Sequence, residues 1–329
     1  MIHEAFSRRH VIGTGLIGAS LALAARGVAA EARPRMRIAS VVTMPSTIYR
    51  GTDVFVPAVP DVDVTIYKGT LGQGERQLYE SVQLGLLEAT IATTGTLSAF
   101  VPEADLFNLP FLFRSKQHAF NVVDGAIGQE FDARVGKKGF HILGWWIAGT
   151  RNTSNNRRPV ESPADYKGMK IRTMESPPYI ALYKAMGAIP VAMPITSVYN
   201  ALSTGAIDGV DGSLSAQLEF KQIEVLKYAA VTDHAVLLYP FVVNLRWFAA
   251  LPEATRQQIV AAEAKARAQQ RTADAEYEAS IEAAWKARGR IVTHPDLAPF
   301  RQVAQQIWPQ FYATVGGREM IDRVEAVPG

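Results

Sequence analysis

The chain has 329 residues, of which 48% are hydrophobic and 20% are charged, with a net charge of +3. This composition is close to that of ordinary globular proteins, and it indicates neither an intrinsically disordered chain nor a membrane-embedded one. The chain contains no cysteine, which excludes disulfides, thiolate nucleophiles and thiolate metal sites.

Residues 1–32 have the organisation of an export signal. The adjacent Arg8 and Arg9 precede an apolar stretch, Val11–Ala25, and the small residues of Val28-Ala-Ala30 or of Ala30-Glu-Ala32 suit a signal peptidase. The arginine pair resembles a twin-arginine signal, which a receptor reads as an address. We therefore predict cleavage near residues 30–32 and a mature protein that is not embedded in a membrane.

Removal of residues 1–30, with three arginines and one glutamate, takes away a net charge of +2 and leaves about +1. The remaining chain has no block of basic residues interleaved with aromatic ones, so nucleic acid is not an expected partner. The signal also contains Gly13-Thr-Gly-Leu-Ile-Gly18, which has the spacing of a dinucleotide-binding motif. That motif requires a preceding strand, which is missing here, so no cofactor is assigned.

Strand and helix patterns alternate along the rest of the chain, which is long enough for two domains. The expected strands are 36–42, 62–67, 89–94, 140–146, 169–172, 189–193 and 206–212, and the expected helices are 75–86, 116–122, 129–137, 177–186, 197–204 and 252–288. This alternation predicts α/β domains with largely parallel sheets. In such domains ligands bind at the carboxyl ends of the strands.

The last of these helices, 252–288, is unusually long. Tyr277, Ile281 and Trp285 recur every four residues, which places them on one face of an amphipathic helix. At 1.5 Å per residue the helix extends for roughly 50 Å. Such a helix braces two domains or forms an oligomer face, and the sequence does not choose between these roles.

Two arginines, Arg151 and Arg172, are the leading candidates for ligand binding. Arg172 ends the short strand 169–172, and a planar guanidinium in that position is suited to bidentate capture of a carboxylate or phosphate. The alternative is a surface salt bridge between Arg172 and Glu175.

Two further features have both structural and functional interpretations. Side chains alternate along a strand, so one indole of Trp145-Trp146 is expected to enter the core and the other to face a small-molecule site. His234, with Ser213 or Ser215, gives a weaker hypothesis of a serine hydrolase. No two histidines have the spacing of a helical zinc site, so no metal site is predicted.

Several motifs together resemble the solute-binding proteins of tripartite ATP-independent periplasmic (TRAP) transporters, the dicarboxylate-binding superfamily. In chain order they are Leu71-Gly-Gln-Gly-Glu-Arg-Gln77, Phe100-Val-Pro-Glu103, Leu109-Pro-Phe-Leu-Phe113, Gly144-Trp-Trp146 with Arg151, Lys167-Gly-Met-Lys-Ile-Arg172, Val198–Gly209 and Thr293–Phe300. The resemblance covers most of the mature chain.

The resemblance implies a two-lobed periplasmic-binding-protein fold of the α/β class, with a ligand cleft between the lobes and a long C-terminal bracing helix. Lobe I would comprise 33–148 and 239–277, and lobe II would comprise 149–238 and 278–329. Arg172 matches the family arginine that pairs with the ligand carboxylate, and Arg151 matches a second arginine near it. The expected ligand contacts are Thr43, Ser46, Glu75, Thr94 and Trp145 from lobe I, and Arg151, Arg172, Met193, Asp211 and Gly212 from lobe II.

The implied function is that of a non-enzymatic periplasmic protein, which captures a small organic acid and delivers it to a membrane permease. A ligand-sensing subunit for a membrane receptor is the alternative. Asp211-Gly212 replaces the Glu-Asn or Glu-Gly that many members carry at this point, which does not support a sialic acid or ectoine ligand. A dicarboxylate, a 2-oxo acid and an aromatic acid remain open.

Overall fold

The computed structural model describes residues 33–72 and 74–329, which form a mixed α/β fold. The export signal and glycine pattern predicted within residues 1–32 lie outside the described residues. The strands are β1 (Arg35–Ser40), β2 (Asp63–Lys68), β3 (Ala89–Ile91), β4 (Phe140–Asn155), β5 (Lys170–Thr173), β6 (Ile189–Ala192), β7 (Gly209–Gly212), β8 (Tyr228–Asn244) and β9 (Ile291–Thr293).

Helices surround this sheet, and six of the thirteen described α-helices lie where the sequence predicts them. They are α1 (Ile48–Phe55), α2 (Glu75–Gln83), α3 (Thr94–Leu97), α4 (Lys116–Val123), α5 (Ala126–Gly136), α6 (Pro177–Ala185), α7 (Val198–Ser203), α8 (Leu214–Glu219), α9 (Leu245–Ala250), α10 (Glu253–Ala287), α11 (Ala298–Ile307), α12 (Tyr312–Val315) and α13 (Gly317–Ala326).

The described strands form one sheet in the order β2-β1-β3-β8-β4-β7-β5-β6, with β9 beside β8. Strand β1 runs parallel to β2 and β3, and β5 runs parallel to β6 and β7. The pairs β3–β8, β8–β4 and β4–β7 are antiparallel. The expectation of largely parallel sheets is therefore correct for the outer strands and wrong for the middle of the sheet.

The two central strands, β4 and β8, connect the β2-β1-β3 side of the sheet to the β7-β5-β6 side. At about 3.3 Å per residue, the 16 residues of β4 extend for roughly 50 Å. The sequence predicts β4 only as far as residue 146 because polar residues follow. Those polar residues are buried in the strand, and register shifts interrupt its pairing with β8 between Ile147 and Thr150.

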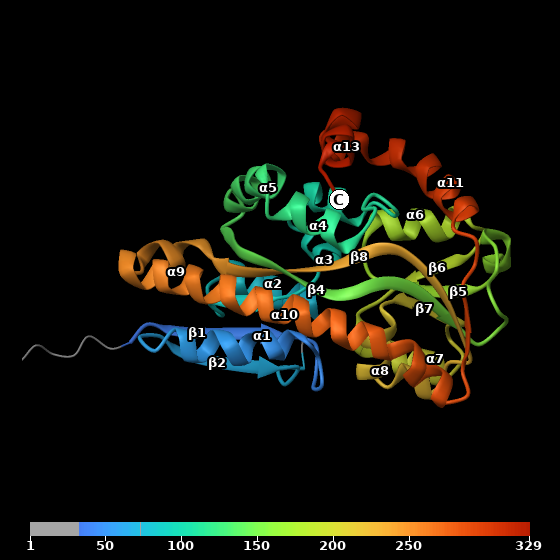
Figure 1. The fold of residues 1–329 in the computed structure, drawn as a ribbon, viewed down its shortest axis with the longest axis horizontal. Coiled ribbons are helices and arrows are strands. Elements are labelled where there is room, and N and C mark those ends of the chain that lie inside the picture. The colour runs from blue at the N-terminus through green and yellow to red at the C-terminus, as the bar shows by residue number, and fades with distance from the viewer. Residues whose placement is uncertain (1–32, 73) are drawn as a thin grey trace, which may run out of the picture. The chain divides into compact units, whose positions relative to one another are not determined.

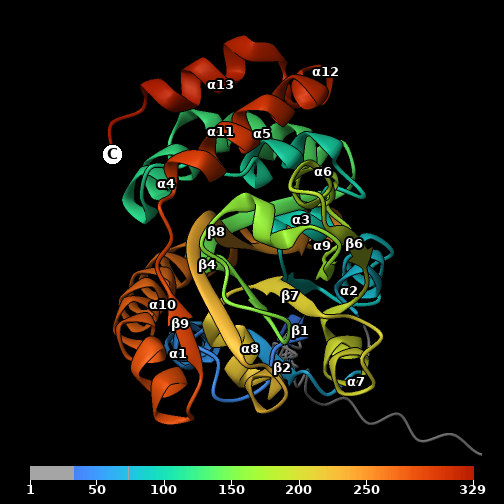
Figure 2. The same cartoon turned by 90° about the vertical axis from the view of Figure 1, so that its right-hand side faces the viewer.

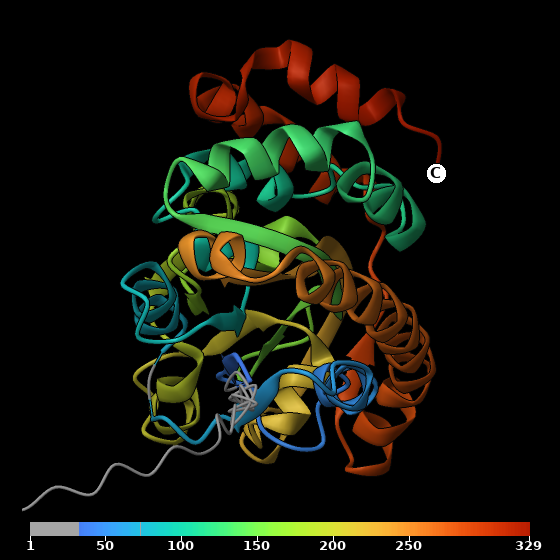
Figure 3. The same ribbon diagram turned by 90° about the vertical axis from the view of Figure 1, so that its left-hand side faces the viewer.

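Helix α10 packs against α1 and β4 near one end and against α8 and β9 near the other (Figure 1). In Figure 3 its orange ribbon lies beside the blue α1. Ile281 and Trp285 are buried and Tyr277 packs against the same hydrophobic cluster, which confirms the predicted apolar face. The long helix therefore braces the sheet from one side to the other.

Polar side chains of α10 bind directly to the middle of β4. Gln270 accepts a hydrogen bond from the Ile147 backbone N–H at 3.1 Å and donates to its carbonyl at 2.6 Å. Glu263 accepts from the Trp146 indole N–H at 2.9 Å. A Cβ on Gly144 would lie 1.8 Å from the Glu263 carboxylate, so this close contact requires glycine.

The C-terminal helices α11 and α12, which the sequence analysis does not predict, cover other parts of the fold. Helix α11 packs on α6, and α12 packs on residues 102–108 (Figure 2). The Trp308 indole N–H donates to the Pro110 carbonyl at 3.1 Å, and Arg114 donates to the Glu325 and Val327 carbonyls. These contacts anchor the end of the chain to the segment before α4.

Candidate ligand-binding site

A cavity of about 100 Å³ lies beside the central strands β4 and β8. Residues of α2 and α3 line one part of it, and residues of β5, β7 and the segments after β5 and β6 line the other. The cavity has room for several water-sized groups, which is the scale of a small organic molecule. The lining residues are Gly74, Glu75, Arg76, Gln77, Thr93, Thr96, Arg151, Arg172, Met174, Glu175, Met193, Pro194, Ile195, Gly212, Ser213, Ala216, Phe220, Leu237 and Tyr239.

Arg172 extends from β5 into this cavity and is 3% exposed. Its guanidinium donates to the Met193 carbonyl at 2.8 and 2.9 Å and to the Asp211 carbonyl at 3.4 Å. Among the described residues no carboxylate lies within ion-pair distance of it. The structure therefore contradicts the alternative of a surface pair with Glu175.

Two effects lower the pKa of Arg172 to about 10: burial first, then the positive charge of Arg151. The negative charges of Asp211 and Glu75 act in the opposite direction. The pKa remains well above neutral, so the guanidinium is charged at pH 7. A charged group with only carbonyl partners is stabilised further when a carboxylate binds it.

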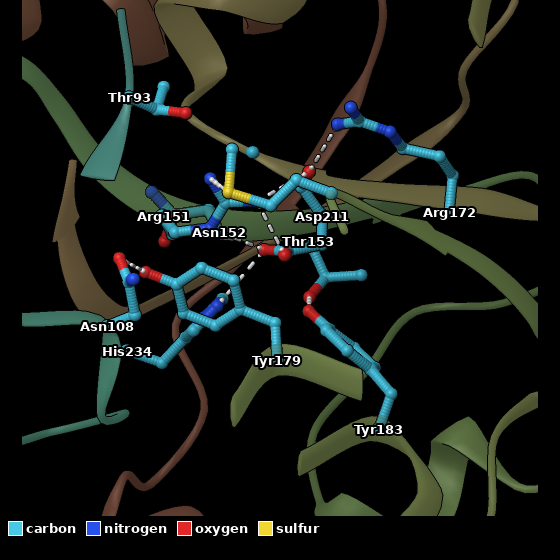
Figure 4. A network of polar contacts seen from close by, with 12 residues as sticks. Thr93, Asn108, Arg151, Asn152, Thr153, Arg172, Tyr179, Tyr183, Asp211 and His234 are labelled. Atoms are coloured by element: carbon cyan, nitrogen blue, oxygen red, sulfur yellow. Dashed lines mark hydrogen bonds and ion pairs between the residues drawn. The ribbon is translucent and has the colours of Figure 1, made fainter. Parts of the chain in front are cut away.

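Arg151, the second predicted arginine, already has a carboxylate partner. Its side chain bonds to the Asp211 carboxylate at 2.6 and 3.3 Å and lies 4.4 Å from the Tyr179 ring centroid (Figure 4). Burial lowers the pKa of Arg151, but the charge and hydrogen bond of Asp211, together with Tyr179 and Tyr183, outweigh burial and raise the pKa overall.

His234 completes a buried cluster with this pair. Its Nε2 lies 3.1 Å from an Asp211 carboxylate oxygen, and its Nδ1 lies 2.9 Å from the Thr232 hydroxyl. Burial raises the pKa of Asp211, but Arg151 and His234 outweigh it and lower the pKa to about 2. Asp211 is therefore ionised at neutral pH and balances the charge of Arg151.

Glu75 lines the cavity from the first turn of α2. Its carboxylate accepts a hydrogen bond from the Thr93 backbone N–H at 3.1 Å, and it also accepts from the hydroxyls of Thr93 and Thr96. In Figure 4, Thr93 lies across the view from Arg172, with the Arg151–Asp211 pair between them. Glu75 comes from α2 and Arg172 from β5, so the site has an anion and a cation on different walls.

Five of the ten predicted ligand contacts line the cavity: Arg151, Arg172, Glu75, Met193 and Gly212. Asp211 lies behind the wall as the partner of Arg151. Thr43, Ser46 and Thr94 are not among the lining residues, and the Thr94 hydroxyl bonds to Asn108 at 2.7 Å. The structure therefore brings half of the predicted set together at the site.

Trp145 is corrected to a core residue. Its ring packs against Phe107 and Phe131 with centroid distances of 5.2 and 5.9 Å, and it is 4% exposed. Trp146 is also buried, with its N–H on Glu263. Both indoles are buried because α10 covers one face of β4 while the aromatic cluster covers the other.

Several lining residues were missed by the sequence analysis. Thr93 and Thr96 flank the predicted Thr94, and Thr93 caps α3 through a bond from the Thr96 N–H. Thr93 bonds to Glu75 whereas Thr94 bonds to Asn108, and the signal that could have identified Thr93 is that of a threonine N-cap before a short helix. Leu237 and Tyr239 come from β8, which was not predicted.

Ser46 lies beside Glu219 at the end of α8. Burial raises the pKa of Glu219 to about 8, with further contributions from the charges of Asp274 and Glu278, while the Ser46 interaction lowers it. A carboxyl whose pKa is raised by folding contributes stability that is complete below its unfolded pKa. That contribution is lost as the pH rises through the folded value.

We therefore expect wild-type stability to fall between about pH 5 and pH 8 through Glu219. In Glu219→Gln, the fall in the free energy of unfolding over this pH range should be smaller by an amount on the order of a few kcal/mol. Thermal unfolding at pH 5, 7 and 9 measures the effect, and Glu276→Gln at an exposed position of α10 is the matched control. Parallel pH profiles for wild type and Glu219→Gln would contradict the assignment.

The residues of the hydrolase hypothesis do not form a nucleophile–base pair. The Ser213 hydroxyl accepts from the Ala216 N–H and from the Ser215 hydroxyl, whereas His234 contacts Asp211 and Thr232. This geometry gives the hydrolase hypothesis no support. Within residues 33–72 and 74–329, no group of His, Asp or Glu side chains is arranged to hold a metal ion. No helix in the described part of the chain is long and apolar enough to span a membrane.

Comparison with known proteins agrees with this fold. A family model described as bacterial extracellular solute-binding protein, family 7, matches residues 60–314. A solute-binding protein of Verminephrobacter eiseniae is 37% identical over 253 residues, or 77% of this chain and 75% of the relative. The 2,3-diketo-L-gulonate-binding periplasmic protein YiaO of Escherichia coli is 32% identical over 261 residues, or 78% and 79% of the two chains.

A solved structure extends the comparison to the arrangement of the elements. A TRAP periplasmic solute-binding protein from Polaromonas sp. JS666, bound to D-erythronate, matches with a TM-score of 0.86 and 30% identity. The match covers 90% of this chain and 99% of the other. The chain therefore belongs to family 7 of the bacterial extracellular solute-binding proteins, which includes the solute-binding proteins of TRAP transporters.

Proposed function

We propose that this protein captures a small organic acid in the periplasm and delivers it to the membrane permease of a TRAP transporter. The observation that carries this proposal is the buried, charged Arg172, which lines the cavity and bonds only to carbonyls among the described residues. A ligand carboxylate would provide the missing counter-charge through charge-assisted hydrogen bonds. The relatives named above bind 2,3-diketo-L-gulonate and D-erythronate, and both are carboxylates.

Ligand capture would proceed by closure of two lobes, 33–148 with 239–277 and 149–238 with 278–329. Strands β4 and β8 cross between them and would bend during the motion. Arg76 of α2 and Glu175 after β5 lie 3.8 Å apart on the cavity wall, so the two sides already approach each other. A ligand shifts the equilibrium toward closure when it contacts both lobes only in that state.

Thermal unfolding with a panel of organic acids tests the proposed function. A ligand that binds only the folded protein at 100 times its dissociation constant adds about 2.7 kcal/mol of stability. We expect at least one carboxylate to raise the melting temperature, and the corresponding alcohol or amide to have no such effect. If no carboxylate in the panel stabilises the protein, or if the neutral analogue stabilises it equally, the proposal is wrong.

A further inference from the structure

Resting on the proposed function, we propose that the ligand of this protein is a hydroxylated monocarboxylate. Arg172 would hold its single carboxylate, and Glu75 would accept a hydrogen bond from one of its hydroxyl groups. The proposal narrows the acids left open by the sequence and makes Glu75 the residue that selects against dicarboxylates.

The balance of charge around the cavity supports one carboxylate rather than two. Three arginines line the described cavity. Arg151 is paired with Asp211, and Arg76 lies 3.3 Å from Glu80 and 3.8 Å from Glu175. Only Arg172 lacks an acidic partner among the described residues. A second ligand carboxylate would therefore enter a cavity with no further cation to receive it, and an unpaired buried charge is costly.

The position of Glu75 adds a directional argument. The negative charge of Glu75 acts on Arg172 and raises its pKa. A dicarboxylate held by Arg172 would bring two negative charges near Glu75, whereas a monocarboxylate would bring one. An ionised carboxylate only accepts hydrogen bonds. Glu75 Oε1 receives one protein donor, the Thr93 N–H, while Oε2 receives two hydroxyls. Oε1 thus keeps acceptor capacity for a donor from the ligand.

Other lining groups suit a neutral, hydroxylated carbon chain. Burial holds the pKa of Tyr239 well above its usual range, so its hydroxyl stays protonated and can both donate and accept. Met174, Leu237 and Phe220 provide apolar walls for the carbon skeleton. A hydroxylated chain satisfies both kinds of surface at once.

An amino acid is the competing ligand class, since an ammonium group also donates to a carboxylate. An ammonium group has three donors. Glu75 already accepts three bonds from Thr93 and Thr96, and Glu175 lies beside Arg76 at the exposed rim. The acceptor position left on Glu75 Oε1 therefore suits a hydroxyl, which donates one hydrogen bond, better than an ammonium, which has three donors.

The test compares acids that differ only in the group at the far end. Isothermal titration of the wild-type protein uses D-erythronate, D-ribonate and D-gluconate, each against the diacid formed by oxidising its terminal CH₂OH. For D-erythronate this diacid is meso-tartrate. Butyrate tests the hydroxyls, and L-threonine tests the ammonium group. At the chain length that binds most tightly, we expect the monoacid to bind at least tenfold more tightly than its diacid and than either control.

A variant then tests whether Glu75 is the cause. Glu75→Gln removes the charge while its amide oxygen still accepts from the Thr93 N–H. We expect the preference for monoacid over diacid to shrink at least fivefold, with Glu276→Gln unchanged as the control. Because the comparison of ligands in wild type needs no variant, poor folding of Glu75→Gln would not prevent the test.

Each other outcome overturns the inference. A diacid, butyrate or L-threonine that binds as tightly as the best monoacid contradicts it, and so does an unchanged preference in a folded Glu75→Gln variant. If no hydroxy acid binds but another carboxylate binds through Arg172, the inference fails and the proposed function survives. If no carboxylate binds at all, the proposed function fails as well.

Discussion

Arg172→Ala is expected to weaken ligand binding by about 2–5 kcal/mol, which is roughly 30-fold to a few thousand-fold in dissociation constant. The guanidinium is buried, charged and bonded only to the Met193 and Asp211 carbonyls among described residues. Its removal would leave the ligand carboxylate buried without a cation. Folding should be preserved, because the variant leaves no protein carboxylate unpaired at the site.

Isothermal titration of a ligand found in the thermal screen measures this effect. Arg172→Lys should recover only part of the affinity, since an ammonium lacks the planar fork that binds a carboxylate in two places. Arg76→Ala is the matched control, because Arg76 also lines the cavity but is half exposed. An affinity loss in Arg76→Ala equal to that in Arg172→Ala would contradict an anchor role specific to Arg172.

The sequence was sufficient to predict the elements whose patterns depend on local spacing. The outer strands and α10 lie close to their predicted limits because alternation and four-residue periodicity are local signals. The second half of β4 was missed because Arg151 and the polar residues after it resemble a loop. Only the tertiary structure shows that Asp211 pairs with Arg151 and that the backbone of the following residues pairs with β7 and β8.

A site residue could be predicted from the sequence where its own chemistry determines its role. It was harder to predict where residues from distant segments determine whether the side chain is buried. A strand-end arginine indicates anion binding by itself, and Arg172 does line the cavity. Trp145 has no such signature, and its burial depends on Phe107 and Phe131 from distant segments. Asp211 was predicted to contact ligand, but its distance from Arg151 makes it an internal partner.

The two arginines that looked equivalent in the sequence therefore have different roles. Asp211 holds Arg151 in place and cancels its charge, and Arg151 in turn lowers the pKa of Arg172 by electrostatic repulsion. A carboxylate bound at Arg172 relieves that repulsion. We therefore propose Arg172 as the anchor and Arg151 as a positioning residue, and the second role predicts an effect on stability rather than on affinity alone.

Asp211→Ala is expected to destabilise the protein by about 3–5 kcal/mol, because it leaves the buried Arg151 guanidinium without its counter-ion. The chemical-denaturation midpoint measures this loss in the absence of ligand. Asp233→Ala is the control, since Asp233 is an acidic residue of the same region with a more exposed side chain.

A double variant separates the unpaired charge from simple loss of packing. Arg151→Met with Asp211→Ala removes both charges of the pair, and replacing a buried ion pair with apolar groups often has little net cost. We expect the double variant to recover most of the stability lost in Asp211→Ala, leaving the cost of the cavity and of the lost His234 contact. If the double variant is less stable than Asp211→Ala, then Arg151 stabilises the fold without its partner, through contacts such as the Tyr179 ring. In that case the unpaired charge is not the source of the instability, and Asp211 supports the site through packing and through His234.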